Sequence, residues 1–504
     1  MLPKAETAWT VFEAAHLLNR AGFGGSPDEI SAFHRLGRVK AVDSLVNPLE
    51  AIDRFPLPEW SVESRALADM QERFKERNMM RRAARDLTAA EAEKLKKKTQ
   101  QENQRQTRQH LLEAQGGWFR RMLKTDAPLR EKMTLFWHDH FATSVQKVKL
   151  PVLLVRQNDL FRRHAFGSFK ALTQEVLMDP AMMLYLDTQS SKKEKPNENF
   201  AREVMELFTL GEGHYEENDI LQAARAFTGY QLNRQTGQVF HNRRQWDPGP
   251  KTIFGSTGNY DGKAVIDLIF QKPAAAEFIC AKLWEFFVAE KPPKAAVAAM
   301  ANDFAKSDFN VGVLLREIFL SEEFYSKASI RTQIKCPIQY LIGMLKHLEV
   351  ESPPNGFPIV AGQQLGQVLF MPPNVAGWDW GKAWINTNTL LTRYNLAGFL
   401  TKGSHGGTLA TKNDKAKGNP RAGDKMGRNW KGPDYERIAP RPIRENPEEL
   451  VDALIFRFFQ SPLPEKARES FVNYAVSKKG EVFTNQEVGE LCHLILSTPH
   501  YQLT

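Results

Sequence analysis

The sequence predicts a mainly α-helical fold, in which many helices form one large bundle around a single core. A small β-hairpin region is expected near residues 229–260. Three observations support this. In most of the chain, apolar residues recur at the spacing of an amphipathic helix. Helix-start signals such as Thr88 with Glu91 stand between these segments. By contrast, residues 230–242 (YQLNRQTGQVFHN) alternate around a Thr-Gly pair, as the strands of a hairpin do.

Composition divides the chain into three parts. Residues 1–401 form the expected main helical domain, which includes the β-hairpin and loop insert at 229–262. Residues 402–446 are rich in Gly, Lys, Arg and Pro and have few aliphatic residues. Such a segment cannot bury enough surface to order itself, so we expect a mobile basic insertion. Residues 447–504 are expected to be helices that pack back on the main domain.

Charge and cysteine content limit the classes of function. The net charge is +9 in 504 residues, but the excess sits in particular segments, so nucleic-acid binding is not the expected role. The three cysteines are far apart and indicate neither a disulfide framework nor a cysteine zinc site. No apolar run is long enough to span a bilayer. The first residues lack the basic start and apolar core of a secretory signal, so we expect a cytoplasmic protein unless a partner carries it out.

The N-terminal third contains clear helix starts. A short helix over 10–20 ends in the sequence NRAGFG, where Arg20 either binds an anion or braces the backbone of the tight turn. Ser26, Pro27 and Glu29 form the start of the next helix. From 61 to 124 the chain favours helix throughout, and the start signal at Thr88 predicts two long helices rather than one. Their mixed charges indicate a solvated surface, with partner contact as the alternative.

The segment LREKMTLFWHDHFATS (129–144) predicts a helix that carries two histidines. His138 and His140 point about 200° apart in a continuous α-helix, so both can bind one metal ion only if the helix ends or widens there. The alternative is that one histidine caps the helix and the other packs in the core. Asp139 lies between them as a candidate catalytic acid.

The segment NENFAREVMELFTLG (197–211) predicts an amphipathic helix that ends at Gly211. Asn199, Glu203 and Glu206 share one flank beside its apolar face. Carboxylates held partly out of water are usually either paired or functional. Glu203 is therefore a candidate general base or metal ligand, and Asn199 a candidate substrate-binding residue; ion pairs with a neighbouring helix are the alternative.

Two irregular segments contain the remaining candidates. After the hairpin, the turn-rich sequence WDPGPKTIFGSTGNYDG contains Asp247, a candidate catalytic acid, and Lys251, a candidate substrate-binding residue. In the segment FMPPNVAGWDWGKAWIN, the prolines exclude a regular helix, and Trp378 and Trp380 crowd a glycine turn. These tryptophans either stack on a sugar or pack under a loop.

The sequence resembles a bacterial family catalogued as domain of unknown function 1800. The matching segments extend over nearly the whole chain: NRAGFG (19–24), LREKMTLFWHDHFATS (129–144), NENFAREVMELFTLG (197–211), ARAFTGY (224–230), PGPKTIFG (248–255), FICAKLWEFFV (278–288), NVAGWDWGKAWIN (374–386) and STPHYQLT (497–504). The resemblance implies a mainly helical fold but no particular activity. It also implies a sulfatase-like partner, because many members are neighbours of a sulfatase-like family whose members often carry export signals.

One position departs from the family pattern. The family usually has His-Asp before the Gly-x-Lys segment, whereas this chain has Trp246-Asp247. If that histidine is a ligand or base in relatives, its role is lost here or passes to His241.

Two classes of function fit these observations. The first is a hydrolase-type enzyme that acts on a polar substrate such as a glycan, with Glu203 and Asp139 or Asp247 as the acid–base pair. Its metal-dependent form would hold a divalent ion through His138, His140 and Glu203. The second is a non-catalytic partner that folds or escorts the sulfatase-like protein, with the basic insertion and the long helices as its interface. Grouping of these residues in one pocket favours the first class, and scattered or ion-paired residues favour the second.

Overall fold

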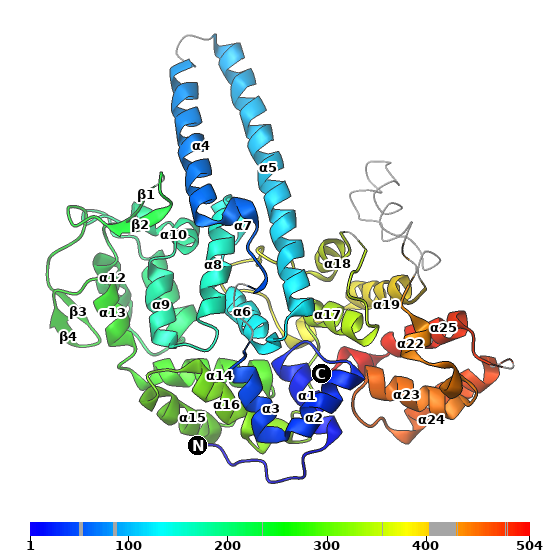
Figure 1. Ribbon diagram of the computed structural model, residues 1–504. Coiled ribbons are helices and arrows are strands. Elements are labelled where there is room, and N and C mark those ends of the chain that lie inside the picture. Colours follow the sequence, from blue (N-terminus) through cyan, green and yellow to red (C-terminus); the bar gives the residue numbers. More distant parts are fainter. Residues whose placement is uncertain are drawn as a thin grey trace.

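The computed structural model describes residues 1–49, 54–83, 88–233, 235–354, 356–402, 430, 432–478, 480 and 482–504. The prediction of a mainly α fold is confirmed: helices account for most of the described chain, together with two antiparallel sheets of two short strands each (Figure 1). No helix among the described residues is long and apolar enough to cross a membrane.

The first three helices pack against one another at the N-terminal end: α1 (Val11–Ala21), α2 (Pro27–Leu36) and α3 (Arg38–Val46). The predicted start at Ser26 is confirmed, because its side chain accepts from the Glu29 N–H while the Glu29 carboxylate accepts from the Ser26 N–H. The same reciprocal pair joins Thr10 and Glu13 at the start of α1.

A long helical hairpin, which we call the arm, projects from the body (Figure 1). It consists of α4 (Glu63–Ala83) and α5 (Ala89–Lys124), preceded by the short 3-10 helix η2 (Glu59–Ser61). The expected helix start at Thr88 is confirmed by the reciprocal hydrogen bonds between Thr88 and Glu91.

The middle of the chain continues as helices that surround α6. Their bounds are α6 (Pro128–His140), α7 (Val145–Val148), α8 (Pro151–Arg163), α9 (Phe169–Leu177), α10 (Pro180–Leu186) and the 3-10 helix η3 (Thr188–Ser190). Every residue of α6 from Leu129 to His140 is buried, including its charged ones, so this helix crosses the core.

The predicted helix at 197–211 is present in a different form. The α-helical part, α11 (Asn199–Glu203), lasts only five residues and continues as a π-helix, η4 (Val204–Thr209). The hydroxyl of Thr209 bonds to the carbonyl of Val204, and the Leu210 N–H reaches back five residues to the carbonyl of Met205 at 2.9 Å. Gly211 ends the segment at φ +79°, as expected for a helix stop.

The β region lies beside α12 (Glu217–Ala226). The predicted hairpin is confirmed: β1 (Tyr230–Asn233) pairs antiparallel with β2 (Gln238–His241), so that Tyr230 faces His241. A second small pair, β3 (Lys251–Ile253) and β4 (Ser256–Gly258), follows in the turn-rich segment.

Helices then resume and lead to the tryptophan-rich loop. They are α13 (Gly262–Ile269), α14 (Pro273–Phe287), α15 (Lys294–Lys306), α16 (Val311–Leu320), the 3-10 helix η5 (Glu323–Tyr325), α17 (Pro337–His347), α18 (Phe357–Leu365), the 3-10 helix η6 (Gly381–Trp384) and α19 (Thr387–Lys402).

The C-terminal elements are short helices: α22 (Tyr435–Ile438), the 3-10 helix η8 (Arg441–Arg444), α23 (Pro447–Phe458), α24 (Glu465–Lys478), α25 (Asn485–Leu496) and the 3-10 helix η9 (Pro499–Gln502). The expectation of a mobile insertion at 402–446 falls mainly on 403–429 and 431, which lie outside the described residues. The described end of that segment packs on the protein, because Tyr435 is buried and its hydroxyl donates to the carbonyl of Thr401.

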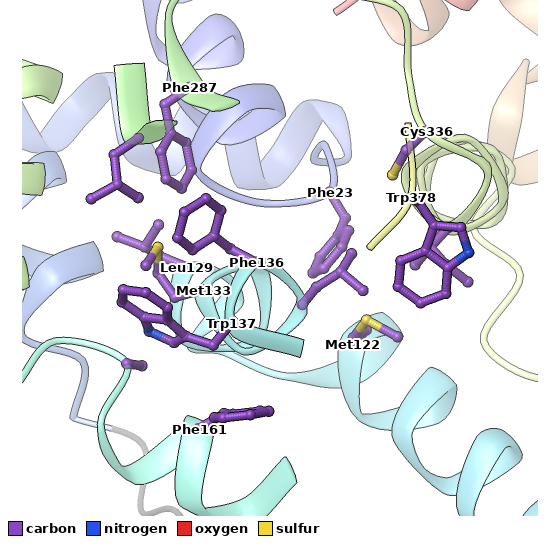
Figure 2. Close-up of a cluster of buried hydrophobic side chains, with 14 of the residues drawn as sticks. Phe23, Met122, Leu129, Met133, Phe136, Trp137, Phe161, Phe287, Cys336 and Trp378 are labelled. Atoms are coloured by element: carbon purple, nitrogen blue, oxygen red, sulfur yellow. The ribbon is translucent and has the colours of Figure 1, made fainter. Parts of the chain in front are cut away.

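One continuous apolar core joins these helices, with a small second cluster between α1 and α2. Figure 2 shows Phe136 and Trp137 of α6 in this core, together with Phe161, Phe287 and Trp378. The three cysteines are all buried and free, so each packs as a small apolar side chain.

Candidate functional site

The C-terminal end of α6 presents three consecutive polar side chains in three directions. His138, Asp139 and His140 are 1%, 8% and 5% exposed, so all three are removed from water. Successive residues of an α-helix point about 100° apart, so each side chain meets a different part of the protein. Buried polar groups need hydrogen-bond partners, and each of the three has its own.

His138 is held in the core by a backbone group. Its Nε2 accepts a hydrogen bond from the Phe370 N–H at 3.0 Å, and its ring packs against those of Trp118 and Trp378. Burial lowers the pKa of His138 to about 3, so the ring is neutral and carries its proton on Nδ1. His138 is therefore a histidine packed in the core, which was the alternative to a metal ligand.

His140 connects the π-helix to α14. The carbonyl of Phe208 can only accept, so His140 donates from Nε2 over 2.9 Å. Its Nδ1 is then the acceptor that faces Lys282 Nζ at 3.4 Å. Lys282 also donates to the carbonyl of Leu207 at 3.3 Å and lies over the ring of Phe278. The end of the π-helix thus supplies two carbonyl oxygens that hold a histidine and a lysine.

Asp139 fastens the tryptophan-rich loop to α6. Its Oδ1 accepts from the Trp378 N–H and its Oδ2 from the Trp380 indole N–H, both at 2.7 Å. Gly377 lies against the same carboxylate at φ +86°, where a Cβ would lie 2.3 Å from Oδ1. Glycine is therefore required at this position for two reasons, the backbone conformation and the close approach.

Burial dominates the electrostatics of Asp139 and Lys282. Desolvation raises the pKa of Asp139 to about 6, although the two hydrogen bonds and the charge of Lys282 oppose that rise. Desolvation likewise lowers the pKa of Lys282, against the attraction of Asp139 and Glu285. Burial thus favours the neutral form of both groups, by raising the pKa of the acid and lowering that of the base. Such opposite pKa shifts are typical of acid–base sites.

The surface above this pair carries an exposed indole and further carboxylates. The Trp380 side chain is 37% exposed and packs edge-on against Phe286, with the ring centroids 5.0 Å apart. Glu285 on α14 is exposed, and partial desolvation and the neighbouring Glu290 raise its pKa. An aromatic face beside carboxylates can bind the apolar face and the hydroxyl groups of a sugar.

The other predicted catalytic residues belong to other elements of the fold. Glu203 is partly buried where α11 meets the π-helix, and its neighbours include Tyr185 and Glu206; desolvation, together with Glu206, raises its pKa. Asp247 forms an ion pair with Arg225, with 2.7 Å between Oδ2 and Nε. Asp139 and Asp247 thus have separate sets of hydrogen-bond and ion-pair partners, and neither set includes Glu203.

The predicted substrate-binding residues have different fates. Asn199 is exposed at the start of α11. Lys251 is buried and donates to the carbonyls of Asp247 and Gly249, so it braces its own loop. Arg20 is 2% exposed and donates to the carbonyls of Val288 and Ser329, which is the backbone-bracing alternative. Lys251 and Arg20 are therefore buried structural cations, and neither is placed to bind a substrate.

The tryptophans are divided in the same way. Trp378 is 6% exposed and packs on His138, so it has no free face for a ligand. Trp380 is the member of the predicted pair that reaches the surface. His241, the proposed substitute for the missing histidine, stacks on Tyr230 within the hairpin, at a centroid distance of 4.5 Å.

The predicted metal site requires a correction. Among the described residues, no three His, Cys, Asp or Glu side chains lie close enough together to hold a metal ion. His138 and His140 point to opposite sides of α6, and each already has a ring nitrogen bonded to the backbone. The set His138, His140 and Glu203 therefore does not form a ligand group.

Lys282 and Glu285 are not among the residues that the sequence pattern singles out. Both lie in the segment FICAKLWEFFV (278–288), whose apolar character indicates a buried helix. Lysine is rarely buried without a partner, so a lone lysine in such a helix indicates a paired or functional group.

These observations define the protein as a mainly helical one with a partly buried carboxyl–lysine–histidine cluster beneath an exposed tryptophan. The family model described as "Protein of unknown function (DUF1800)" matches residues 16–503, and the chain belongs to that family. No curated protein and no solved structure matches the chain.

Proposed function

We propose that this chain is a hydrolase-type enzyme that acts on a polar substrate, such as a glycan, at the cluster of Asp139, Lys282 and Trp380. The observation that carries the proposal is the 2.7 Å hydrogen bond between Asp139 and the exposed indole of Trp380. It joins a carboxyl group with a pKa of about 6 to an aromatic surface on which a sugar ring can stack.

The roles follow from the protonation states. Protonated Asp139 gives its proton to the leaving oxygen as the glycosidic bond breaks. Water supplies the new bond to the sugar carbon, and Glu285 takes the proton that this water releases. Lys282 holds His140 and the end of the π-helix in place and stabilises Asp139 after it ionises. Trp380 positions the substrate.

The test is an assay of the purified protein on a panel of polysaccharides and aryl glycosides. Hydrolysis is measured as the release of reducing ends or of the aryl alcohol. The wild-type protein should be active, with activity lost above about pH 6 as Asp139 loses its proton. Asp139→Asn and Glu285→Gln should each reduce turnover by about 100-fold or more. The matched control is Asp28→Asn, which changes an exposed carboxylate in the first turn of α2.

Near-ultraviolet circular dichroism separates lost chemistry from a lost fold, because Asp139→Asn also alters the hydrogen bonds of Trp378 and Trp380. Full activity in a folded Asp139→Asn protein, or no hydrolysis of any glycan by the wild type, would contradict the proposal.

A second candidate function is a non-catalytic partner that folds or escorts a sulfatase-like protein. The specific observation in its favour is that Asp247 is ion-paired with Arg225, as expected for a structural carboxylate. Co-expression of the two proteins should then raise the soluble yield of the sulfatase-like one, and Asp139→Asn should leave that yield unchanged.

A further inference from the structure

Among the described residues, the contacts that anchor the arm lie at its base. There, Trp60 stacks on His110 at a centroid distance of 4.2 Å, and its indole N–H donates to Glu113 at 3.0 Å. Met70 is 8% exposed and lies against Gly237 of the β1–β2 turn. From 71 to 113, no described side chain is buried, so the outer part of the arm stands in solvent (Figure 1).

The inner side of the arm gives its two helices little apolar support. A gap of about 320 Å³ separates them, and its lining includes Met80 from α4 and Thr99 and Asn103 from α5. The α5 segment 96–109 contains no aliphatic or aromatic residue. Helices without a shared apolar face are marginal on their own, so the fold maintains about 30 Å of helix that contributes little to its core.

The outer side of α5 carries a continuous basic stripe. At 100° per residue, five cations fall within an arc of about 100°, on the side away from Thr99 and Asn103. These five residues, which we call the basic stripe, are Lys94, Lys97, Lys98, Arg105 and Arg108, and all are exposed.

No carboxylate of α5 falls within the arc of the basic stripe. Glu91 lies about 20° outside one edge, and Glu93 and Glu102 each lie about 40° outside the arc on opposite sides. Glu102 also lines the gap that faces α4. None of the five cations has an ion-pair partner among the residues that the structure describes. A row of unneutralised cations about 21 Å long is therefore presented at one helix face.

We propose that the basic stripe is a docking surface for an acidic helix of another protein. Carboxylates three, four and seven residues apart on one face of a partner helix would match the spacing of these cations along α5. The proposal is independent of the hydrolase activity, because the stripe belongs to the arm and the catalytic cluster to the body.

A protein helix fits this surface better than nucleic acid or a membrane does. The stripe is only one helix wide, and Glu91 beside its edge would face the phosphates of a duplex. Membrane-binding helices combine basic residues with a broad apolar face, which the segment 96–109 lacks.

The test uses the full-length protein and three probes: a labelled 21-residue helical peptide with glutamates at i, i+4, i+7 and i+11, a 20-base-pair DNA duplex, and phosphatidylglycerol vesicles. The acidic peptide should bind, and Lys97→Glu combined with Lys98→Glu and Arg105→Glu should weaken binding at least about tenfold. The matched control replaces Lys192, Lys193 and Lys195, three exposed lysines of another loop, by glutamate and should bind as the wild type does.

Each other outcome overturns the proposal. These outcomes are absence of peptide binding, equal loss of binding in both triple variants, and tighter binding of the duplex or the vesicles than of the peptide. Sedimentation of the protein alone serves as a further check. If the wild type is a dimer and the triple variant of Lys97, Lys98 and Arg105 is a monomer, the basic stripe binds a second copy of this chain instead of another protein.

Discussion

Charged and polar side chains behave in opposite ways at the end of α6 and on the outer part of α5. In α6, Asp139 and His140 are almost fully buried, and identified groups hold each of them. On α5, the basic stripe is exposed along its whole length. Polar residues in the core thus determine local structure through their hydrogen bonds, whereas the cations of the basic stripe form no ion pair among the described residues. Four measurements can break or sharpen this contrast.

The largest effect is expected from Trp137→Ala. Trp137 is fully buried and stacks on Phe169 at 5.5 Å, so its removal leaves a large cavity beside α6. We expect a loss of about 3–5 kcal/mol in the free energy of unfolding, measured with urea. Trp137→Phe is the matched control: the indole N–H has no partner among the described residues, so that variant should lose much less. Equal losses in both variants would contradict this account.

Acid should destabilise the body next most strongly. Burial lowers the pKa of both His16 and His138 to about 3, below the value near 6.5 in the unfolded chain. Between these values the unfolded chain binds protons that the folded chain does not, so stability is present above about pH 6.5 and falls as the pH drops toward 3.

Two buried carboxyl groups act in the opposite direction. Burial raises the pKa of Asp139 to about 6 and that of Asp179 to about 7, so their contribution is present at low pH and is lost as the pH rises. His140 and His347, whose pKa values burial also lowers, add to the effect of His16 and His138. Urea unfolding between pH 6.5 and 4.5 should therefore show a net loss of several kcal/mol. His138→Gln should reduce the change in the free energy of unfolding between these pH values. An unchanged slope against pH would contradict the lowered pKa of His138.

Gly377→Ala should have an intermediate effect. The added Cβ would meet Asp139 at a backbone position with φ +86°, which would release the Trp380 indole from its carboxylate. We expect a loss of about 1–3 kcal/mol together with a red shift of tryptophan fluorescence. Gly366→Ala isolates the backbone term, because Gly366 has φ +90° and open space where its Cβ would lie. Gly366→Ala should lower the free energy of unfolding by less and leave the tryptophan fluorescence unchanged. The same red shift in both variants would contradict a specific role for the hydrogen bond between Asp139 and Trp380.

The smallest effect is expected on the arm. Lys97→Ala removes an exposed side chain that no described contact holds, so the free energy of unfolding should change by no more than about 0.5 kcal/mol. A loss above 1 kcal/mol would mean that the basic stripe supports the fold.

The same contrast separates what the sequence could predict from what it could not. Helix starts at Ser26 and Thr88 were predictable because a cap is a local hydrogen-bond pattern. The divergence of His138 and His140 was equally predictable, since it follows from helix geometry. The π-helix was not, because it depends on which carbonyls later receive partners from α14 and α6.

Site residues divide by whether their partners are local. Lys251 and Asp247 bind within their own loop and to nearby Arg225, so a turn-rich sequence alone could not distinguish a structural brace from a catalytic group. Asp139 was predicted as a catalytic residue from its place between two histidines. Its hydrogen-bond partners Trp378 and Trp380 are more than 230 positions away in the chain, so these bonds could not be anticipated.

The π-helix has a consequence for how this family can tolerate insertions and deletions. Its wide turn accommodates one residue more than an α-helix would over the same rise. Deleting one residue between Val204 and Thr209 would restore the narrower turn and rotate Glu203 by about 100° relative to Phe208. Carbonyls that now meet His140 and Lys282 would then re-enter ordinary helical pairing. Members of the family should therefore keep the length of this segment even where its residues change.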